Sequence, residues 1–368
     1  MSTIRTLLAI PAAVLGLFLA LPIVVLGLPF WTIAFLTRFM ANRLESQFLS
    51  WSELIEFDPL VGWRPKANLN AYYLSVHDDI FSTVTDSSGW PGKARLEESD
   101  VVVFGDSFAF GYGVNREECF AELNTRPCIK AIGAPGYNMV QELLLMQQFK
   151  LQLKGKFVVW FICLENDLYE NLMPHMRGYR MPFVRRGHGN GGWKIVTEHL
   201  SPTKWFYSSP EWWRSFHEVF ANLCGETFLA ARAYSACEFL IQEGARVCSQ
   251  VDAQLVILTI PHVSLLTRQG LEQLKAHCGR EQTFNPDFPD QKISQICQKY
   301  NVPFLAAKQH LGALDYKEHD PHWNQRGHQR VAQLLIDLYI AFRSGALPMT
   351  VAQENISQAG DRLSVCST

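Results

Sequence analysis

The sequence predicts an α/β protein, a three-layer α/β/α sandwich built on a mainly parallel five-stranded sheet. Beyond residue 100, five short apolar runs of buried-strand character alternate with stretches of helical apolar spacing. Strands that alternate with helices are typical of βαβ units, whose parallel sheet is covered by helices on both faces. A chain of 368 residues is also long enough to bury the core that such a sandwich needs.

The predicted strands and helices follow one another through most of the chain. The strands are expected at 101–104, 129–132, 157–164, 255–260 and 302–306, each a short apolar run. Helical spacing covers 139–153, 216–250, 293–300 and 327–343. Parallel sheets of this kind bind ligands beyond the carboxyl ends of their strands, which is where we expect a functional site.

The first 44 residues differ in character from the rest of the chain. From Thr6 to Thr37, 32 residues carry no charge and are rich in Leu, Val, Ile and Phe. Roughly 20 apolar residues span a bilayer, whereas the apolar core of a signal peptide has only about 7–15. We therefore expect residues 1–44 to be a retained membrane anchor, with a transmembrane helix or a re-entrant hairpin, because prolines interrupt the run. A buried core helix is the alternative.

The rest of the chain divides into three stretches. Residues 45–97 form a polar preamble, which we expect to pack on the main domain at residues 98–345. Within that domain, residues 169–213 break the strand and helix rhythm and are rich in aromatics, arginines and glycines. This insertion is interpreted either as a lid or binding surface or as a floppy loop. Residues 346–368 look like a polar tail.

Charge and cysteine content exclude several classes of function. The net charge is −2 and no Lys/Arg block occurs, so no nucleic-acid partner is expected. The nine cysteines include no C-x-x-C pair, which argues against a zinc ribbon or a regular disulfide framework. Several lie in apolar runs, where cysteine behaves as a small hydrophobe, and Cys119 and Cys128 could bridge a short loop. We expect neither a metal nor another cofactor.

The first predicted strand ends in Gly-Asp-Ser at residues 105–107, at the edge of the sheet where functional groups belong. Ser107 is therefore either part of an ordinary turn or a nucleophile. A dinucleotide-binding fingerprint does not fit these residues. Gly111 and Gly113 are not followed by a third glycine, because Arg116 stands in its place.

A serine nucleophile needs a base and a group that orients the base. His322 lies in a predicted loop just ahead of the last helix, with Asp320 two residues before it, so one segment supplies both groups. His310, His319 and His328 compete with His322, although His328 falls inside the predicted helix and is interpreted as structural. A metal site formed by His319, Asp320 and His322 is an alternative, but no matching ligand cluster occurs elsewhere in the sequence.

Ester chemistry also needs donors for a developing oxyanion. Gly136 follows the second strand and can present its backbone N–H without a side chain in the way. Asn166 follows the third strand and can present a side-chain amide. Taken singly, Gly136 is also explained as a turn residue and Asn166 as a helix cap. The chain order of Ser, Gly, Asn and His at strand ends or in loops indicates a shared site.

In these residues the sequence resembles the SGNH hydrolases, also called the GDSL family. Four blocks match the family over about residues 101–342, namely Gly105-Asp106-Ser107, Gly136, Asn166-Asp167 and Asp320-Pro321-His322. The resemblance implies Ser107 as the nucleophile, His322 as the base and Asp320 as its orienting group. It also implies an oxyanion hole made by the Ser107 N–H, Gly136 and Asn166. The Asp-x-His-Trp form resembles bacterial polysaccharide O-acetyltransferases, and residues 57–65 look like the lead-in of membrane-anchored bacterial members.

The resemblance implies acyl-ester chemistry, by an esterase or an O-acyl(acetyl)transferase acting on an esterified glycan or lipid near the membrane. A periplasmic or extracellular domain would fit, although the charges flanking the anchor are nearly balanced. A lipase is a weaker alternative. A non-catalytic glycan- or lipid-binding module is the rival, using Trp193, Trp205, Trp212 and Trp213. Glu165 sustains that rival, since the family usually has glycine at or just before this position. An extended strand would turn its carboxylate away from the Asn166 face.

Overall fold

The computed structural model describes residue 49 and residues 51–349, except for 76–78, 177, 188–191, 204–210 and 280–282 and the side chains of 211–216. The predicted membrane anchor at residues 1–44 lies outside the described residues. Within them, no helix combines the length and the apolar character that a bilayer crossing requires. The chain separates into residues 1–49 and 50–368, and the central sheet belongs to the second unit.

The central sheet has five parallel strands in the order β13-β12-β7-β5-β6, which confirms the predicted fold class. These strands are β5 (Val101–Gly105), β6 (Ile129–Gly133), β7 (Phe157–Cys163), β12 (Gln254–Ile260) and β13 (Phe304–Ala306). Because β5 lies between β6 and β7, the strand order reverses there. Parallel sheets bind ligands outside the carboxyl ends of the strands at such a point.

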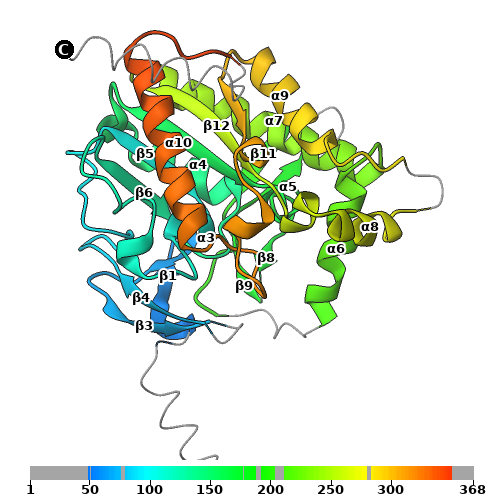
Figure 1. Cartoon of the computed structure of the whole chain (residues 1–368), viewed down its shortest axis with the longest axis horizontal. Helices are drawn as coiled ribbons and strands as arrows, with labels where there is room; N and C mark the ends of the chain where they lie inside the picture. Colours follow the sequence, from blue (N-terminus) through cyan, green and yellow to red (C-terminus); the bar gives the residue numbers. More distant parts are fainter. Residues whose placement is uncertain are drawn as a thin grey trace, which may run out of the picture. The chain divides into compact units, whose positions relative to one another are not determined.

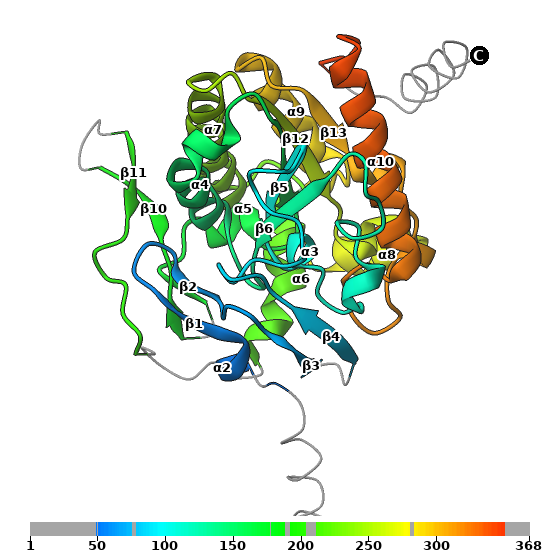
Figure 2. The same cartoon turned by 90° about the vertical axis from the view of Figure 1, so that its left-hand side faces the viewer.

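Helices cover both faces of this sheet, with α4 and α7 on one side and α10 on the other (Figures 1 and 2). The longer helices are α4 (Met139–Gln148), α6 (Glu211–Leu223), α7 (Phe228–Ser249), α8 (Arg268–Ala276), α9 (Phe288–Lys299) and α10 (Gln325–Arg343). The shorter ones are α2 (Trp51–Leu54), α3 (Ser107–Phe110), α5 (Asp167–Glu170), η1 (Arg116–Glu118), η2 (Lys150–Leu153), η3 (Val263–Leu266), η4 (Ala307–Gln309) and η5 (Ala313–Asp315).

Alternate residues of the buried strands point to opposite faces, so each face carries its own apolar layer. On one face Val103 and Phe161 belong to the same buried cluster as Leu335 of α10. On the other face Trp160 packs against α7, where Gly244 leaves room for the indole. A Cβ at Gly244 would lie 2.6 Å from the Trp160 ring.

The prediction of one helix over 216–250 is wrong, because the chain forms α6 and α7 with a break between them. Thr227 caps the second helix, accepting a hydrogen bond from the Ala230 N–H at 3.0 Å. A side-chain oxygen of this kind satisfies one of the donors that a helix start leaves open. The helix expected over 139–153 likewise ends at Gln148, and η2 continues it as a 3₁₀ turn.

The preamble consists of two antiparallel hairpins that the sequence patterns did not predict. They are formed by β1 (Ile55–Asp58) with β2 (Gly62–Pro65), and by β3 (Asn70–Leu74) with β4 (Ile80–Val84). Both lie at the α3 end of the sheet (Figures 1 and 2). Lys130 of β6, only 1% exposed, joins the segment after β4 to the sheet by donating to Asp86 at 2.7 Å and to the Pro91 carbonyl at 3.1 Å.

The insertion at 169–213 also contains two hairpins. Its strands are β8 (His175–Met176), β9 (Tyr179–Arg180), β10 (Phe183–Arg186) and β11 (Trp193–Val196). Asn138, fully buried, donates from its amide to the carbonyls of Glu170 and Pro182. The start of this segment is therefore fixed to the loop between β6 and α4.

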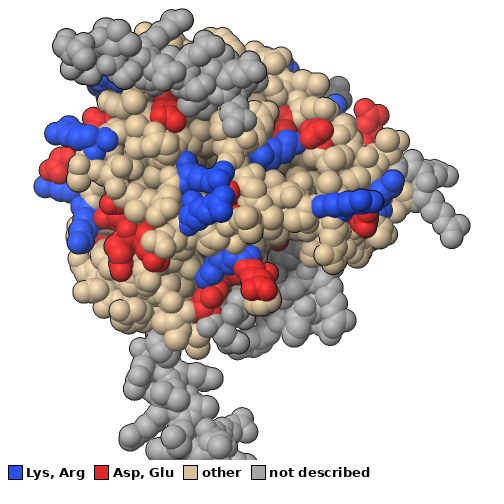
Figure 3. Space-filling model, viewed as in Figure 1, with Lys and Arg blue, Asp and Glu red and all other residues tan. Residues whose placement is uncertain are grey.

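The surface seen in Figure 3 shows basic and acidic side chains interspersed over a largely uncharged face. No single sign of charge dominates it, in keeping with a net charge of −2.

Candidate active site

Ser107 lies at the carboxyl end of β5, where the sheet order reverses. Asp106 caps the short helix α3 by accepting the Phe108 N–H at 2.9 Å, and this leaves Ser107 as the first helical residue. Its side chain sits in a largely closed environment, since Ser107 is 8% exposed. Gly133 permits this packing, because a Cβ there would overlap the Gly105 carbonyl oxygen. The Gly-Asp-Ser turn is thus held against the end of β6.

Ser107, His322 and Asp320 form a continuous hydrogen-bonded triad. The Ser107 Oγ lies 2.7 Å from His322 Nε2, and His322 Nδ1 bonds to Asp320 Oδ1. The same Asp320 oxygen accepts the backbone N–H of His322 at 2.9 Å, so one carboxylate fixes both the main chain and the ring. These three predicted site residues, from distant parts of the chain, therefore come together as expected for a nucleophile, a base and an orienting acid.

The protonation pattern of the triad follows from these contacts. The carboxylate oxygen can only accept, so Nδ1 carries the imidazole proton and Nε2 accepts the Ser107 hydroxyl. Asp106 Oδ2, the other acceptor near that hydroxyl, lies farther away at 3.4 Å. Burial raises the pKa of Asp106 to about 6, against the lowering effects of the Phe108 N–H and of His322.

Two aromatic rings enclose the His322 imidazole. The Phe108 ring centroid lies 5.0 Å from it and the Tyr112 centroid 4.8 Å. Trp323, fully buried, packs edge-on against Phe108 at 4.7 Å. The tryptophan of the Asp-x-His-Trp motif therefore packs behind the base and has no place in the opening of the site.

Gly136 occupies the loop after β6 with φ of +78°, a backbone conformation that favours glycine. Any Cβ there would also overlap the end of Met176, which comes from the insertion. The preamble holds the same loop. Trp63 donates from its indole to the Pro135 carbonyl at 3.3 Å, and Tyr137 donates to the Trp63 carbonyl at 2.7 Å. The loop that contains Gly136 is thus held in place by contacts with both the preamble and the insertion at 169–213.

Asn166 follows β7 at the N-terminal cap position of α5, where its side chain makes no capping hydrogen bond and its amide instead donates to Glu170 Oε2 at 3.2 Å. An amide nitrogen has two hydrogens, so this bond orients the group and leaves a second donor. Because β6 and β7 flank β5, Gly136 and Asn166 lie at the ends of the two strands on either side of the Ser107 turn. Both residues therefore lie at the same edge of the sheet as Ser107.

The strand does not stay extended as far as Glu165, because β7 ends at Cys163 and a turn follows, so the condition under which the Glu165 carboxylate would point away from the Asn166 face is not met. The Glu165 carboxylate nevertheless has a partner, with its Oε1 3.8 Å from His262 Nε2. His262 is 3% exposed and accepts the Ser264 N–H at Nδ1, so the neutral ring carries its proton on Nε2, toward Glu165. His262 is not among the residues predicted from the sequence, although its position just after the fourth sheet strand was a usable signal.

The competing histidines lie elsewhere. His328 is buried and its Nδ1 accepts the Phe120 N–H at 3.3 Å, while His319 is 83% exposed. Burial lowers the pKa of His310. Through the described ranges, no group of three or more His, Cys, Asp or Glu side chains is arranged to hold a metal ion. Cys119 and Cys128, which could have formed a bridge, are free thiols.

The aromatics assigned to a binding module are only partly described. Trp193 donates its indole N–H to Ser235 at 3.0 Å and lies against Arg186. Trp205 and the side chains of Trp212 and Trp213 lie outside the described part of the structure.

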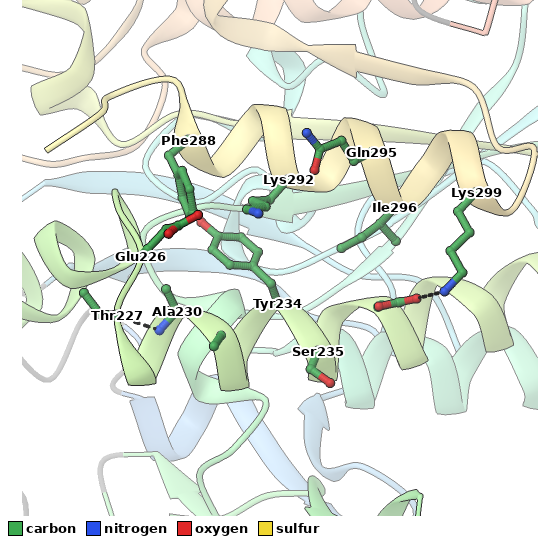
Figure 4. Close-up of a pocket in the computed structure, with 12 residues that line it drawn as sticks. Glu226, Thr227, Ala230, Tyr234, Ser235, Phe288, Lys292, Gln295, Ile296 and Lys299 are labelled. Atoms are coloured by element: carbon green, nitrogen blue, oxygen red, sulfur yellow. Dashed lines mark hydrogen bonds and ion pairs between the residues drawn. The ribbon is translucent and has the colours of Figure 1, made fainter. Parts of the chain in front are cut away.

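A separate groove of about 550 Å³ lies between α7 and α9 and contains none of the triad (Figure 4). Tyr234 and Phe288 line its apolar part, and Lys299 at its edge is paired with Glu238 at 2.5 Å.

No family model matches the sequence, and no curated protein matches it either. Among solved structures, a member of the lipolytic G-D-S-L family from Veillonella parvula is 11% identical with a TM-score of 0.35, over 63% of this chain and 93% of that one. A GDSL-like lipase from Bacteroides thetaiotaomicron is 11% identical with a TM-score of 0.37, over 67% and 91%. An alpha/beta hydrolase enzyme from the metagenome of Lake Arreo is 15% identical with a TM-score of 0.34, over 68% and 96%. At these identities and scores, the solved structures identify neither the reaction nor the substrate of this chain, so both have to be inferred from the geometry of the site.

Proposed function

We propose that this protein is a serine-dependent ester hydrolase or O-acyltransferase. The observation that carries the proposal is the triad, in which Ser107 Oγ lies 2.7 Å from His322 Nε2 and Asp320 bonds to the other ring nitrogen. A hydroxyl becomes a nucleophile when a neutral base accepts its proton and a third group holds that base in the correct tautomer.

In the proposed reaction, Ser107 Oγ attacks the ester carbonyl while His322 Nε2 takes the hydroxyl proton. Asp320 stabilises the imidazolium that forms, and the imidazolium then protonates the departing alcohol. The resulting acyl-serine is resolved by water in an esterase or by a sugar hydroxyl in an acyltransferase, with His322 again acting as base. The Ser107 and Gly136 N–H groups and the Asn166 amide are the proposed oxyanion donors, each of which is typically worth about 10²–10³ in rate.

Two of the acidic residues near these donors favour their uncharged forms, which supports catalysis over mere binding. Beneath the site, burial raises the pKa of Glu142 and Asp167 well above the usual range of a carboxyl group, which favours their uncharged forms. A developing oxyanion would therefore meet less opposing charge than the number of acidic residues suggests.

The triad predicts that Ser107→Ala removes activity without disturbing the fold. Hydrolysis of p-nitrophenyl acetate should fall on the order of 10⁴-fold or more, and labelling by a fluorophosphonate probe should disappear. Ser249→Ala, which changes an exposed serine on α7, is the matched control and should keep both. Labelling that survives in Ser107→Ala would remove this serine from the mechanism, and an unlabelled parent protein would favour the glycan- or lipid-binding module.

The nature of the acceptor separates hydrolysis from transfer. An acetylated oligosaccharide product, formed from p-nitrophenyl acetate in the presence of the sugar, would identify a transferase, whereas acetate alone would identify an esterase.

We propose an esterified glycan or lipid close to a membrane as the natural substrate, with the domain on the periplasmic or extracellular side. The apolar run from Thr6 to Thr37 and the resemblance in sequence support that setting.

A further inference from the structure

We propose that Lys317 is a positioning residue that holds the His322 loop against the Ser107 turn, with Asp79 of the preamble as its charged partner. This inference rests on the proposed function, since it concerns the same triad. Neither Lys317 nor Asp79 touches the reacting atoms.

The Lys317 ammonium group joins three separate segments. It donates to the Gly113 carbonyl at 2.7 Å, just after the Ser107 helix, and it lies 2.7 Å from Asp79 Oδ2, just before β4. The Lys317 side chain is 16% exposed and that of Asp79 is 36% exposed, so the pair is partly shielded from solvent. Shielding makes such a pair better defined in geometry than a fully exposed ion pair.

The backbone at Lys317 also closes the loop that carries the base. Its N–H donates to the His322 carbonyl at 3.0 Å, and Tyr316 pairs with Trp323 in an isolated bridge. A Cβ placed on Gly113 would lie 3.3 Å from Lys317 Nζ and 3.9 Å from His322 Cβ. Because the main chains of Lys317 and His322 are hydrogen-bonded, we expect a shift at Lys317 to move the loop that carries the imidazole.

The preamble is also connected to His322 through packed aromatic rings. Tyr73 of β3 and Phe81 of β4 pack on Tyr112 at 5.7 and 5.0 Å, and Tyr112 packs on His322 at 4.8 Å. The β3–β4 hairpin therefore contacts the base loop through an ion pair on one side and through a ring on the other. This hairpin lies outside the α/β sandwich, yet we infer that it completes the active site.

The test uses the full-length chain purified in detergent, with the variants Lys317→Met, Lys317→Arg and Asp79→Asn. Lys308→Met is the matched control, because Lys308 is 19% exposed and is held by Asp287 at 2.6 Å and by Asp290 at 2.8 Å. Turnover of p-nitrophenyl acetate, the rate of fluorophosphonate labelling and the melting temperature are measured for each protein.

Lys317→Met should lower kcat about 10–100-fold with KM within about twofold, because a misplacement near 1 Å can cost about 10²-fold in rate. The labelling rate should fall in parallel. Lys317→Arg should recover most of the loss, since the guanidinium can still donate to both partners, and Asp79→Asn should give an intermediate decrease. Lys308→Met should keep kcat within twofold. A Lys317→Met protein with unchanged kcat and labelling, or equal decreases in both lysine variants, would overturn the proposal.

A spectroscopic readout separates this inference from the proposed function. In ¹⁵N-histidine-labelled protein, the Nδ1–H of His322 should give a protected low-field proton signal, assigned by its absence in His322→Gln. Lys317→Met should weaken that signal through faster solvent exchange, whereas Lys308→Met should not. If the parent chain shows no Ser107-dependent turnover, the proposed function fails while a weakened signal still supports the positioning role. A signal that Lys317→Met leaves unchanged would reject the role whatever the activity.

Discussion

Two histidines near the end of the chain have opposite environments. His322 bonds to Ser107 and Asp320, lies between Phe108 and Tyr112, and has a side chain that is 16% exposed. His328, six residues later, is 1% exposed and stacks on Phe120 with its Nδ1 accepting a backbone N–H. Burial, helped by Arg116, lowers the pKa of His328 to about 3. The first ring is suited to proton transfer, while the second acts as a neutral acceptor in the core.

His328 should therefore make the fold sensitive to mild acid. Its pKa lies at about 3 when folded and near 6.5 when unfolded, so the unfolded state binds the extra proton between these values. The stability it confers is present above pH 6.5 and is lost as the pH falls toward 3. Each pH unit inside that window costs roughly 1.4 kcal/mol.

Urea unfolding between pH 7 and pH 5 measures this loss. In His328→Asn the side-chain oxygen can still accept the Phe120 N–H, but it cannot be protonated in this range. The free energy of unfolding should therefore decline less steeply than in the parent protein. Parallel declines in the two proteins would show that His328 does not set the acid sensitivity.

The sequence was sufficient to identify the triad residues but not those that surround them. Ser107, Asp320 and His322 could be assigned because each chemical role restricts the residue type and because each lies at a strand end or just before a helix. The roles of Lys317 and Tyr112 depend on contacts with the preamble, whose hairpins have no distinctive sequence period. The pairing of Glu165 with His262 depends on where β7 ends, and strand ends are poorly defined by apolar runs alone.

At the scale of elements, the strands of the central sheet were predicted well because they are buried on both faces. Val101 to Phe104 and Phe157 to Cys163 are continuous apolar runs with almost no exposure, which is typical of parallel strands. The four preamble strands are short and only partly buried, so they lack that signal. The break between α6 and α7 was missed because apolar spacing continues on both sides of it.

The attachment of the preamble to the sheet depends on a buried ion pair. Lys130 is almost fully enclosed, and its only charged partner in the described salt bridges is Asp86, whose side chain is 24% exposed. Burial lowers the pKa of Lys130, and the bond to Asp86 acts against that effect. The bond to Asp86 thus offsets part of the desolvation cost of a buried ammonium group.

Removing Asp86 should therefore lower the free energy of unfolding more than removing the charge of Lys130 does. Asp86→Asn leaves a buried ammonium without its anion and should lower the free energy of unfolding by about 3 kcal/mol. Lys130→Met replaces the charge by an apolar side chain of similar length, leaves a partly solvated Asp86, and should cost less. Thermal or urea unfolding of both variants checks the order, and a larger loss in Lys130→Met would contradict it.

At the scale of the whole molecule, the triad, both proposed oxyanion loops and the preamble contacts all belong to residues 50–368. The apolar run from Thr6 to Thr37 precedes these residues in the sequence. If that run is the membrane anchor, as its length of 32 uncharged residues predicts, anchoring and catalysis should be separable.

A chain that begins at residue 50 should accordingly keep its kcat on p-nitrophenyl acetate within about twofold. A membrane anchor determines where an enzyme is located but does not determine which reaction its site performs. The full chain should remain with membranes after a carbonate wash, whereas the shortened chain should not sediment. Full-length Ser107→Ala, which keeps the apolar run but lacks the nucleophile, should partition like the parent protein. Release of the full chain by the wash would contradict the anchor, and loss of turnover on shortening would show that residues 1–49 take part in the site.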